Sequence, residues 1–385
     1  MKSLKQMILN VIEQSPRGYA EELAKIAGYA NGSGLKKPLT KEEKEFDNLD
    51  GLVQLVRHLF PDQERALIEE FSMTLDVNNK LARYMLEYLS CNRLLVTMDQ
   101  LLTRMESAKN TTSREWAKVY RLQHEWQTEY YNIKPLEMLD KVNEIKTTIP
   151  ELKTQLSIMT CNVFYRDKNY KVAYQLYAGI KEGLFQIKDQ YVKKALQVKA
   201  NEIVSYIYLR VQDKPEEARE RAMEVLSLNV GETFNAYANY IIGSSYFYTS
   251  FEKANHYLNL SKTTYEKIGR AEAKNDIIDN IEKLEIVWNK SEDRFFVSNE
   301  NKLFNMIKNG NDVTEQLEAN KGKINEAFYN YLMGLLENDT NLLSLSMIQY
   351  SKKGDSFWAR LPMIELKKNG VHEMLLNELL KFNAA

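Results

Sequence analysis

Apolar residues recur at spacings of three and four along most of the chain, which is typical of amphipathic α-helices rather than of strands. The stretch LVQLVRHLF at 52–60 predicts one helix, and Pro61 predicts that another begins directly after it, because proline suits the first helical turn. The clearest start is at 213–228, DKPEEARERAMEVLSL, with Asp213 as the expected cap and Pro215 in the first turn. The pattern predicts an all-α fold.

Small residues point to paired helices in the middle of the chain. A small residue is followed four positions later by a packing residue at 173–177, 218–222, 254–258 and 346–350. Gly243 stands 11 residues before Ala254, and Gly334 stands 12 residues before Ser346, each in an aromatic-rich stretch. Small side chains there would let two helices approach closely. This favours degenerate tetratricopeptide-like repeats, stacked helix pairs of about 34 residues, with a generic helical bundle as the alternative.

The N-terminal charge distribution suggests a separate small module. Residues 1–40 carry six Lys or Arg and three acids, whereas residues 41–50, KEEKEFDNLD, carry two Lys and five acids. A basic head followed by an acidic hinge is typical of a module boundary.

Within that head, the stretch ELAKIAGYANGSGL at 22–35 holds three glycines after a short helical pattern. Its spacing does not fit a phosphate-binding loop. It fits a helix-turn-helix, with Leu35 and Leu39 inward and a second helix from about Ser33 that Pro38 interrupts. A surface helical hairpin with a polar loop is the alternative. The candidate DNA-binding residues are Arg17, Lys25, Tyr29, Asn31, Ser33, Lys36 and Lys37.

Other chemistry finds little support. The net charge is −1, so any attraction to nucleic acid must be local. The four histidines and two cysteines lack metal-ligand spacing, and no nucleophile motif is present, so we expect neither an enzyme nor a metal or cofactor. No stretch reaches the roughly 18 apolar residues of a membrane span, and two cysteines suit a reduced compartment. We expect a cytoplasmic protein without a membrane partner.

Aromatic helices offer a candidate groove for an extended peptide. In YANYIIGSSYFYTSF at 237–251, Tyr240 and Ser244 share one helical side with two further tyrosines. Such a side would line the inner groove of a stacked array, although core packing is the alternative. In KANEIVSYIYLR at 199–210, the same role is expected of Asn201, Glu202 and Tyr206.

The C-terminal stretch VHEMLLNELLKF at 371–382 is short and apolar. It could cap the last repeat or form a dimer contact, and both roles can coincide. The candidate dimer residues are Leu375, Leu376, Leu379, Leu380 and Phe382.

Two blocks resemble the AimR family, the arbitrium receptors of Bacillus phages. The first is FPDQERALIEEFSMTLDVNNKLARYMLEYL at 60–89, and the second is GDSFWARLPMIELKKNG at 354–370. LAKIAG at 23–28 is similar to the first helix of the family's helix-turn-helix. The length matches end to end, while the middle is diverged.

The resemblance implies a helix-turn-helix at 1–48, a tetratricopeptide-like peptide-binding array at 49–365 and a capping or dimerising helix at 366–385. Such receptors bind double-stranded promoter DNA as homodimers in the bacterial host and activate a gene that favours lysis. An imported phage hexapeptide then binds the array and ends activation, which favours lysogeny. The alternative is a peptide-sensing repeat protein that acts on another protein, as response-regulator inhibitors or phosphatases do, without binding DNA.

The resemblance also implies a peptide that ends in a basic residue followed by Gly-Ala, with its basic side chain held by Asp355. Three of the site residues, Tyr206, Thr233 and Ser244, stand where better-known members carry Asn or Arg, so a different specificity is expected. The full set of candidate peptide-binding residues is Asn201, Glu202, Tyr206, Thr233, Tyr240, Ser244, Asp355 and Phe357.

Overall fold

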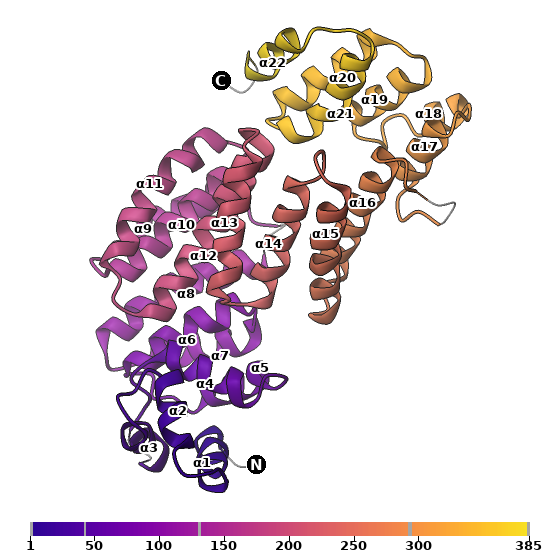
Figure 1. Cartoon of the computed structure of the whole chain (residues 1–385). Helices are drawn as coiled ribbons and strands as arrows, with labels where there is room; N and C mark the ends of the chain where they lie inside the picture. The colour runs from indigo at the N-terminus through magenta and orange to yellow at the C-terminus, as the bar shows by residue number, and fades with distance from the viewer. Residues whose placement is uncertain (1–2, 42–43, 130–131, 292–294, 383–385) are drawn as a thin grey trace. The chain divides into compact units, whose positions relative to one another are not determined.

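The chain is helical throughout the residues that its computed structural model describes, which are 3–41, 44–129, 132–291 and 295–382. These residues form twenty-two α-helices and one π-helical turn, and no strand (Figure 1). The predicted all-α fold is confirmed. The chain divides into two compact units, of which the first holds Met1–Asp167 and Gln175–Ala200 and the second holds Lys168–Tyr174 and Asn201–Ala385.

The first unit contains ten complete helices among its described residues, and most of them pack on a neighbour in the chain. They are α1 (Leu4–Gln14), α2 (Tyr19–Ile26), α3 (Gly32–Thr40), α4 (Leu49–Leu59), α5 (Glu64–Met73), α6 (Lys80–Cys91), α7 (Leu95–Glu106), α8 (Thr111–Thr128), α9 (Pro135–Glu144) and α10 (Pro150–Arg166). Two further helices, α11 (Tyr170–Gln186) and α12 (Gln190–Tyr206), belong partly to each unit.

A buried polar network joins α6, α8, α10 and α12 in the core of the first unit. Glu87 is fully buried and pairs with Lys199 at 2.6 Å. The hydroxyl of Tyr120 donates to the other carboxylate oxygen of Glu87, and Lys199 also donates to Gln155 at 3.2 Å. Because charged groups inside a core need partners, this network stabilises the packing in which α6, α8, α10 and α12 bring these side chains together.

The second unit begins its own helices with the π-helical turn η1 (Ile207–Val211). The α-helices that follow are α13 (Pro215–Leu228), α14 (Glu232–Ser245), α15 (Phe251–Lys267), α16 (Ala271–Val287), α17 (Asn299–Lys308), α18 (Thr314–Ala319), α19 (Glu326–Leu336), α20 (Thr340–Lys352), α21 (Ser356–Lys368) and α22 (Glu373–Phe382). Helices α13 to α16 and α19 to α21 pack as successive neighbours along the chain (Figure 1).

The two glycines singled out in the sequence lie where paired helices touch. A Cβ at Gly243 of α14 would lie 2.9 Å from the Leu258 nitrogen and 3.1 Å from the Ala254 carbonyl oxygen of α15. A Cβ at Gly334 of α19 would lie 3.0 Å from the Leu343 nitrogen of α20. The expected close helix pairs are therefore present at both positions.

Three local predictions need correction. Helix α5 begins at Glu64 rather than at Pro61, which lies in the turn before it. Asp213 does not cap α13, because it has a positive φ of 54° and pairs with Arg360 at 2.6 Å. Pro38 does not interrupt α3, which continues to Thr40.

Candidate functional sites

The turn between α2 and α3 is built from its glycines. Gly28 has a φ of +74°, a conformation that favours glycine. Gly32 begins α3, where a Cβ would lie 2.9 Å from the Cβ of Ala20, so the two helices meet closely there. The Gly32 nitrogen donates to the Glu21 carboxylate at 2.9 Å, and the Asn31 side chain caps α3 by accepting from the Gly34 nitrogen at 2.8 Å.

The α2–α3 pair rests directly on α4. A Cβ at Gly51 would lie 2.0 Å from the carbonyl oxygen of Ala27, so the start of α4 touches the end of α2. Phe46 is buried and packs edge-on against Phe71, with ring centroids 6.1 Å apart. The acidic segment expected to be a hinge is thus anchored by an aromatic contact.

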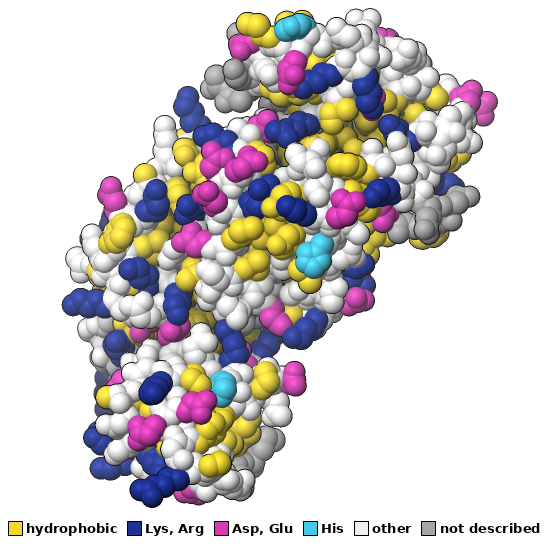
Figure 2. All heavy atoms as spheres, viewed as in Figure 1, with side chains coloured by type: hydrophobic (Ala, Val, Ile, Leu, Met, Phe, Trp, Pro, Cys, Tyr) yellow, Lys and Arg dark blue, Asp and Glu magenta, His cyan; other side chains and the backbone are white. Residues whose placement is uncertain are grey.

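Most of the candidate DNA-binding residues are exposed, and Leu35 and Leu39 of α3 are buried as expected. The exposed ones are Arg17, Lys25, Asn31, Ser33, Lys36 and Lys37. In the view of Figure 2, several Lys and Arg side chains lie along the outer edge of the end that holds the N-terminal helices, with acidic side chains also present there. The side-chain oxygen of Asn31 caps α3 by accepting from the Gly34 nitrogen. A contact with DNA would therefore use the side-chain amide nitrogen of Asn31.

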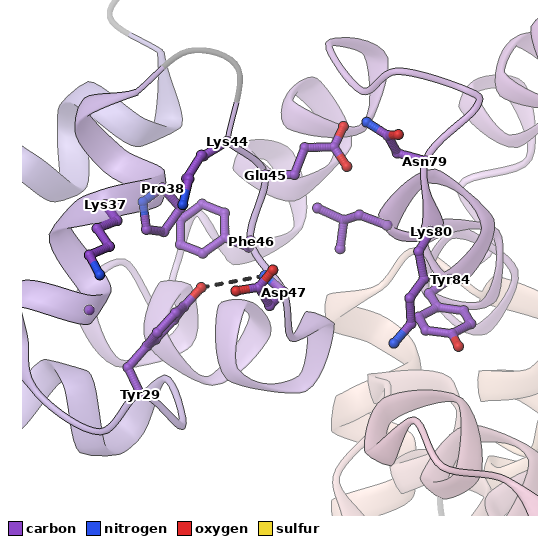
Figure 3. Close-up of a pocket in the computed structure, with 12 residues that line it drawn as sticks. Tyr29, Lys37, Pro38, Lys44, Glu45, Phe46, Asp47, Asn79, Lys80 and Tyr84 are labelled. Carbon is purple, nitrogen blue, oxygen red and sulfur yellow. Dashed lines mark hydrogen bonds between the residues drawn. The ribbon is translucent and has the colours of Figure 1, made fainter.

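Tyr29 differs from the other candidates because it faces the inside of the head. It is half-buried, its hydroxyl accepts from the Asp47 nitrogen at 3.4 Å, and burial raises its pKa. Together with Lys37 it lines a cavity of about 740 Å³ that also borders the start of α6 (Figure 3). Tyr29 therefore holds the segment after α3 in place, which the sequence pattern did not indicate.

A second cavity, of about 380 Å³, lies within the second unit and is rich in charge. Its lining comes from η1 and from α14, α16, α17, α19, α20, α21 and the residue before α19. The lining residues are Arg210, Tyr240, Asp276, Asp279, Asn280, Lys283, Glu300, Asn325, Phe328, Tyr350, Asp355 and Trp358.

Two of the four cavity carboxylates already have basic partners. Asp355 pairs with Arg210 at 2.5 Å through one oxygen and caps α21 through the other, which accepts from the Trp358 nitrogen at 3.1 Å. Asp279 pairs with Lys283 one turn along α16. Asp355 was expected to hold the basic side chain of a peptide; it lines the cavity, and each of its oxygens has one contact within the chain.

The other two carboxylates, Asp276 and Glu300, carry the unbalanced charge of the cavity. Burial raises the pKa of Asp276, and the nearby Asp279 and Glu272 raise it further. Burial also raises the pKa of Glu300, while Lys283 opposes this shift. Because a raised carboxyl pKa means that the surroundings, on balance, disfavour the anion, a positively charged group bound here would favour the ionised form of both carboxylates.

Most of the candidate peptide-binding residues do not line this cavity. Of the eight, Tyr240 and Asp355 line it. Asn201, Ser244 and Phe357 are buried, and Glu202, Tyr206 and Thr233 are half-buried. Sequence reasoning missed Arg210, Asp276, Lys283 and Glu300; the one local signal was the polar stripe at spacings of three and four along α16.

The C-terminal helix divides its leucines between the core and the surface. Leu376 and Leu380 are buried in the core of the second unit, and Leu379 packs against it. Leu375 is 57% exposed, so among the four candidate dimer leucines it offers the largest apolar surface to a partner. The side chain of Phe382 lies outside the described residues.

The described part of the chain holds neither a metal cluster nor a membrane-spanning helix. No group of three His, Cys, Asp or Glu residues there could hold a metal ion. No described helix combines the length and apolar character needed to cross a membrane.

The described residues form an all-α protein whose second unit holds a charged cavity, and comparison with known proteins defines its class. Residues 64–368 match the family model described as AimR transcriptional regulator-like. The match covers most of the chain, so the chain belongs to that family of transcriptional regulators. The matched region begins at Glu64, the first residue of α5, and does not include the N-terminal head.

Individual relatives extend the likeness over the head as well. The chain is 25% identical to the AimR transcriptional regulator of Bacillus phage phi3T, over 96% of this chain and 99% of the relative. It is also 25% identical to the AimR transcriptional regulator of Bacillus phage SPbeta, over 93% and 94% of the two chains.

Solved structures show the same fold. The structure of SeMet-phAimR matches with a TM-score of 0.77 at 24% identity, over 98% of this chain and all of the other. The structure of phAimR with its ligand matches with a TM-score of 0.68 at 22% identity, over 85% of this chain and 98% of the other.

Proposed function

We propose that the chain is a peptide-gated transcriptional regulator. As a homodimer it binds promoter DNA through α2 and α3 and activates a phage gene that favours lysis. A short linear peptide then binds in the cavity of the second unit and ends activation, which favours lysogeny. In functional terms the chain divides into the head at 1–48, the peptide-binding array at 49–365 and the C-terminal helix at 366–385.

The observation that carries the peptide part is the pair Asp276, which is exposed, and Glu300, which is half-buried, two carboxylates whose pKa values are raised at a cavity of about 380 Å³. This volume suits part of a short peptide rather than a folded partner. A basic side chain placed between them would gain a charge-assisted contact in a partly dry site. We place the basic residue of the peptide at Asp276 and Glu300, in the cavity that Asp355 also lines.

The DNA part rests on the outward side of α3, where Ser33, Lys36 and Lys37 are exposed beside each other. Short polar and basic side chains at this place suit base edges and phosphates. A ligand can change DNA affinity only through its different affinity for the two states of the protein. Peptide binding must therefore favour the conformation that leaves the promoter.

The test starts with selection of duplexes from a random DNA pool by the full-length chain. Affinity for the selected duplex is then measured with and without a synthetic pool of hexapeptides ending in Arg-Gly-Ala. We expect sequence-specific binding that the peptide pool weakens. If the chain binds DNA specifically and no peptide changes its affinity, regulation by the peptide is excluded. If the chain shows no specific DNA binding, a regulator that acts on another protein is favoured.

Substitution of basic residues locates the DNA contact better than truncation, because removal of the head would expose the face of α4 that Gly51 presents to Ala27. Lys36→Ala with Lys37→Ala should weaken binding to all duplexes and reduce the salt slope by about two. Lys153→Ala with Lys188→Ala removes the same charge from exposed positions outside the head and should change neither.

A further inference from the structure

Arg210 occupies an unusual place in the chain. It lies on the π-helical turn Ile207–Val211, which follows α12 directly. Such turns are rare and occur frequently at functional sites, because they redirect side chains from the regular helical positions. Here the turn directs Arg210 to the wall of the charged cavity, where 8% of the residue remains exposed.

The guanidinium group is held on several sides. Its Nη2 atom donates to Asp355 at 2.5 Å. The guanidinium carbon lies 5.0 Å from the ring centre of Phe357 and 5.4 Å from that of Trp358. Burial is the largest influence and acts to lower the pKa of Arg210, but Asp355, Tyr240 and Tyr206 together outweigh it and the pKa is raised, so the group stays protonated. It is therefore a fixed cation with little freedom to turn away.

One donor of this fixed cation is not used. The Nε atom of Arg210 is buried and has no hydrogen-bond partner among the described residues. A buried donor on a charged group is costly to leave unsatisfied. Because Arg210 lines the cavity, a bound ligand can supply the missing acceptor.

We propose that Arg210 is a specificity-determining residue that donates its Nε–H to an acceptor oxygen of the bound peptide. This inference rests on the proposed peptide-binding function. The cavity then has two poles: an acceptor of the ligand meets Arg210, and the basic side chain meets Asp276 and Glu300. The acceptor is either a backbone carbonyl or the terminal carboxylate, since both present the same kind of oxygen.

The two contacts fix the direction of the ligand in the cavity. A peptide bound in reverse would place its basic group, which is a donor, beside the Arg210 Nε–H, which is also a donor, and would leave Asp276 and Glu300 without a basic partner. Two donors facing each other form no hydrogen bond, so the reversed direction is disfavoured. A basic side chain alone is therefore not sufficient for recognition.

The test uses the full-length chain and the tightest-binding hexapeptide from the Arg-Gly-Ala pool, with affinity measured by calorimetry. Arg210→Lys keeps the positive charge but removes the Nε–H, and we expect it to weaken binding about tenfold or more. Arg360→Lys is the matched control, because Arg360 pairs with Asp213 in the same unit and does not line the cavity. Equal affinity in a folded Arg210→Lys chain would overturn the proposal.

A crystal structure of the wild-type complex gives a test that does not depend on the variant folding. We expect a peptide oxygen within hydrogen-bond distance of Arg210 Nε, and its absence would overturn the proposal. The C-terminal amide of the same peptide separates the two sources: loss of affinity identifies the terminal carboxylate, and unchanged affinity with the contact present identifies a backbone carbonyl. If the wild-type chain binds no peptide from the pool, the proposed function itself fails instead.

Discussion

Gly51 at the start of α4 lies directly against Ala27 at the end of α2, so that a Cβ on Gly51 would come within 2.0 Å of the Ala27 carbonyl oxygen. Backbone cannot yield as a flexible side chain does. The contact therefore fixes how the head rests on the rest of the first unit, and Gly51 can be replaced only if α4 moves away from α2.

Gly51→Ala should destabilise the first unit by about 1–3 kcal/mol, the usual cost of overpacking. Urea unfolding followed by circular dichroism measures this. Gly179→Ala is the control, because Gly179 lies in α11 with open space around it. It should be stabilising by about 1 kcal/mol, since alanine is the better helix former. Similar effects of the two substitutions would show that the Gly51 contact is not tight.

The buried pair Glu87 and Lys199 gives a second prediction. Lys199→Met leaves the Glu87 carboxylate buried without its basic partner and should cost about 3–5 kcal/mol of unfolding free energy. Lys199→Met combined with Glu87→Gln removes both charges and should recover much of that loss. The recovery is measured as a double-mutant cycle by urea unfolding. If the losses simply add, the two charges do not stabilise each other.

Local patterns allowed much of the fold to be predicted. The pairing of α14 with α15 was visible because Gly243 and Ala254 are small residues 11 positions apart, one on each side of the turn between the two helices. The turn between α2 and α3 was visible for the same reason, since its glycines mark positive φ or close contact. Both the helix pair and the turn are formed by residues that are close to one another in the sequence.

The cavity could not be predicted in this way. Arg210 and Asp355 are 145 residues apart, and nothing local indicates that their side chains meet. The resemblance pointed to Asp355, but its cap on α21 and its pair with Arg210 depend on the packed fold. In α22 the leucine pattern predicted an apolar face, whereas packing decides that Leu376 turns inward and Leu375 outward.

That division gives a third prediction, for the proposed homodimer. Leu375→Glu should shift the dimer towards monomer in light scattering and leave the melting temperature of the second unit nearly unchanged, because Leu375 is 57% exposed. Leu376→Glu should instead lower the melting temperature, because it places a charge in the core, where Leu376 is 1% exposed. If the Leu375→Glu chain remains dimeric, Leu375 is not part of the dimer interface.

The fourth prediction concerns pH. Asp276 and Glu300 must be ionised to hold a cation, and burial raises the pKa of both in the ligand-free chain. A bound cation favours the ionised forms, so binding lowers these pKa values and releases protons. Peptide affinity should therefore fall as pH drops through the raised carboxyl range, at a higher pH than an exposed Asp or Glu would give. Calorimetry in buffers of different ionisation enthalpy measures the released protons.

Variants assign this pH dependence to the two carboxylates. Asp276→Asn with Glu300→Gln should weaken binding of the basic hexapeptide at neutral pH and flatten the dependence, because neither amide titrates. Glu326→Gln removes an exposed carboxylate at the start of α19 that does not line the cavity, and should leave both affinity and slope unchanged. If the double variant keeps the wild-type slope, other groups bind the cation. Because the amides keep the size of the original side chains, a loss of affinity in a folded double variant reports on charge rather than on the shape of the cavity.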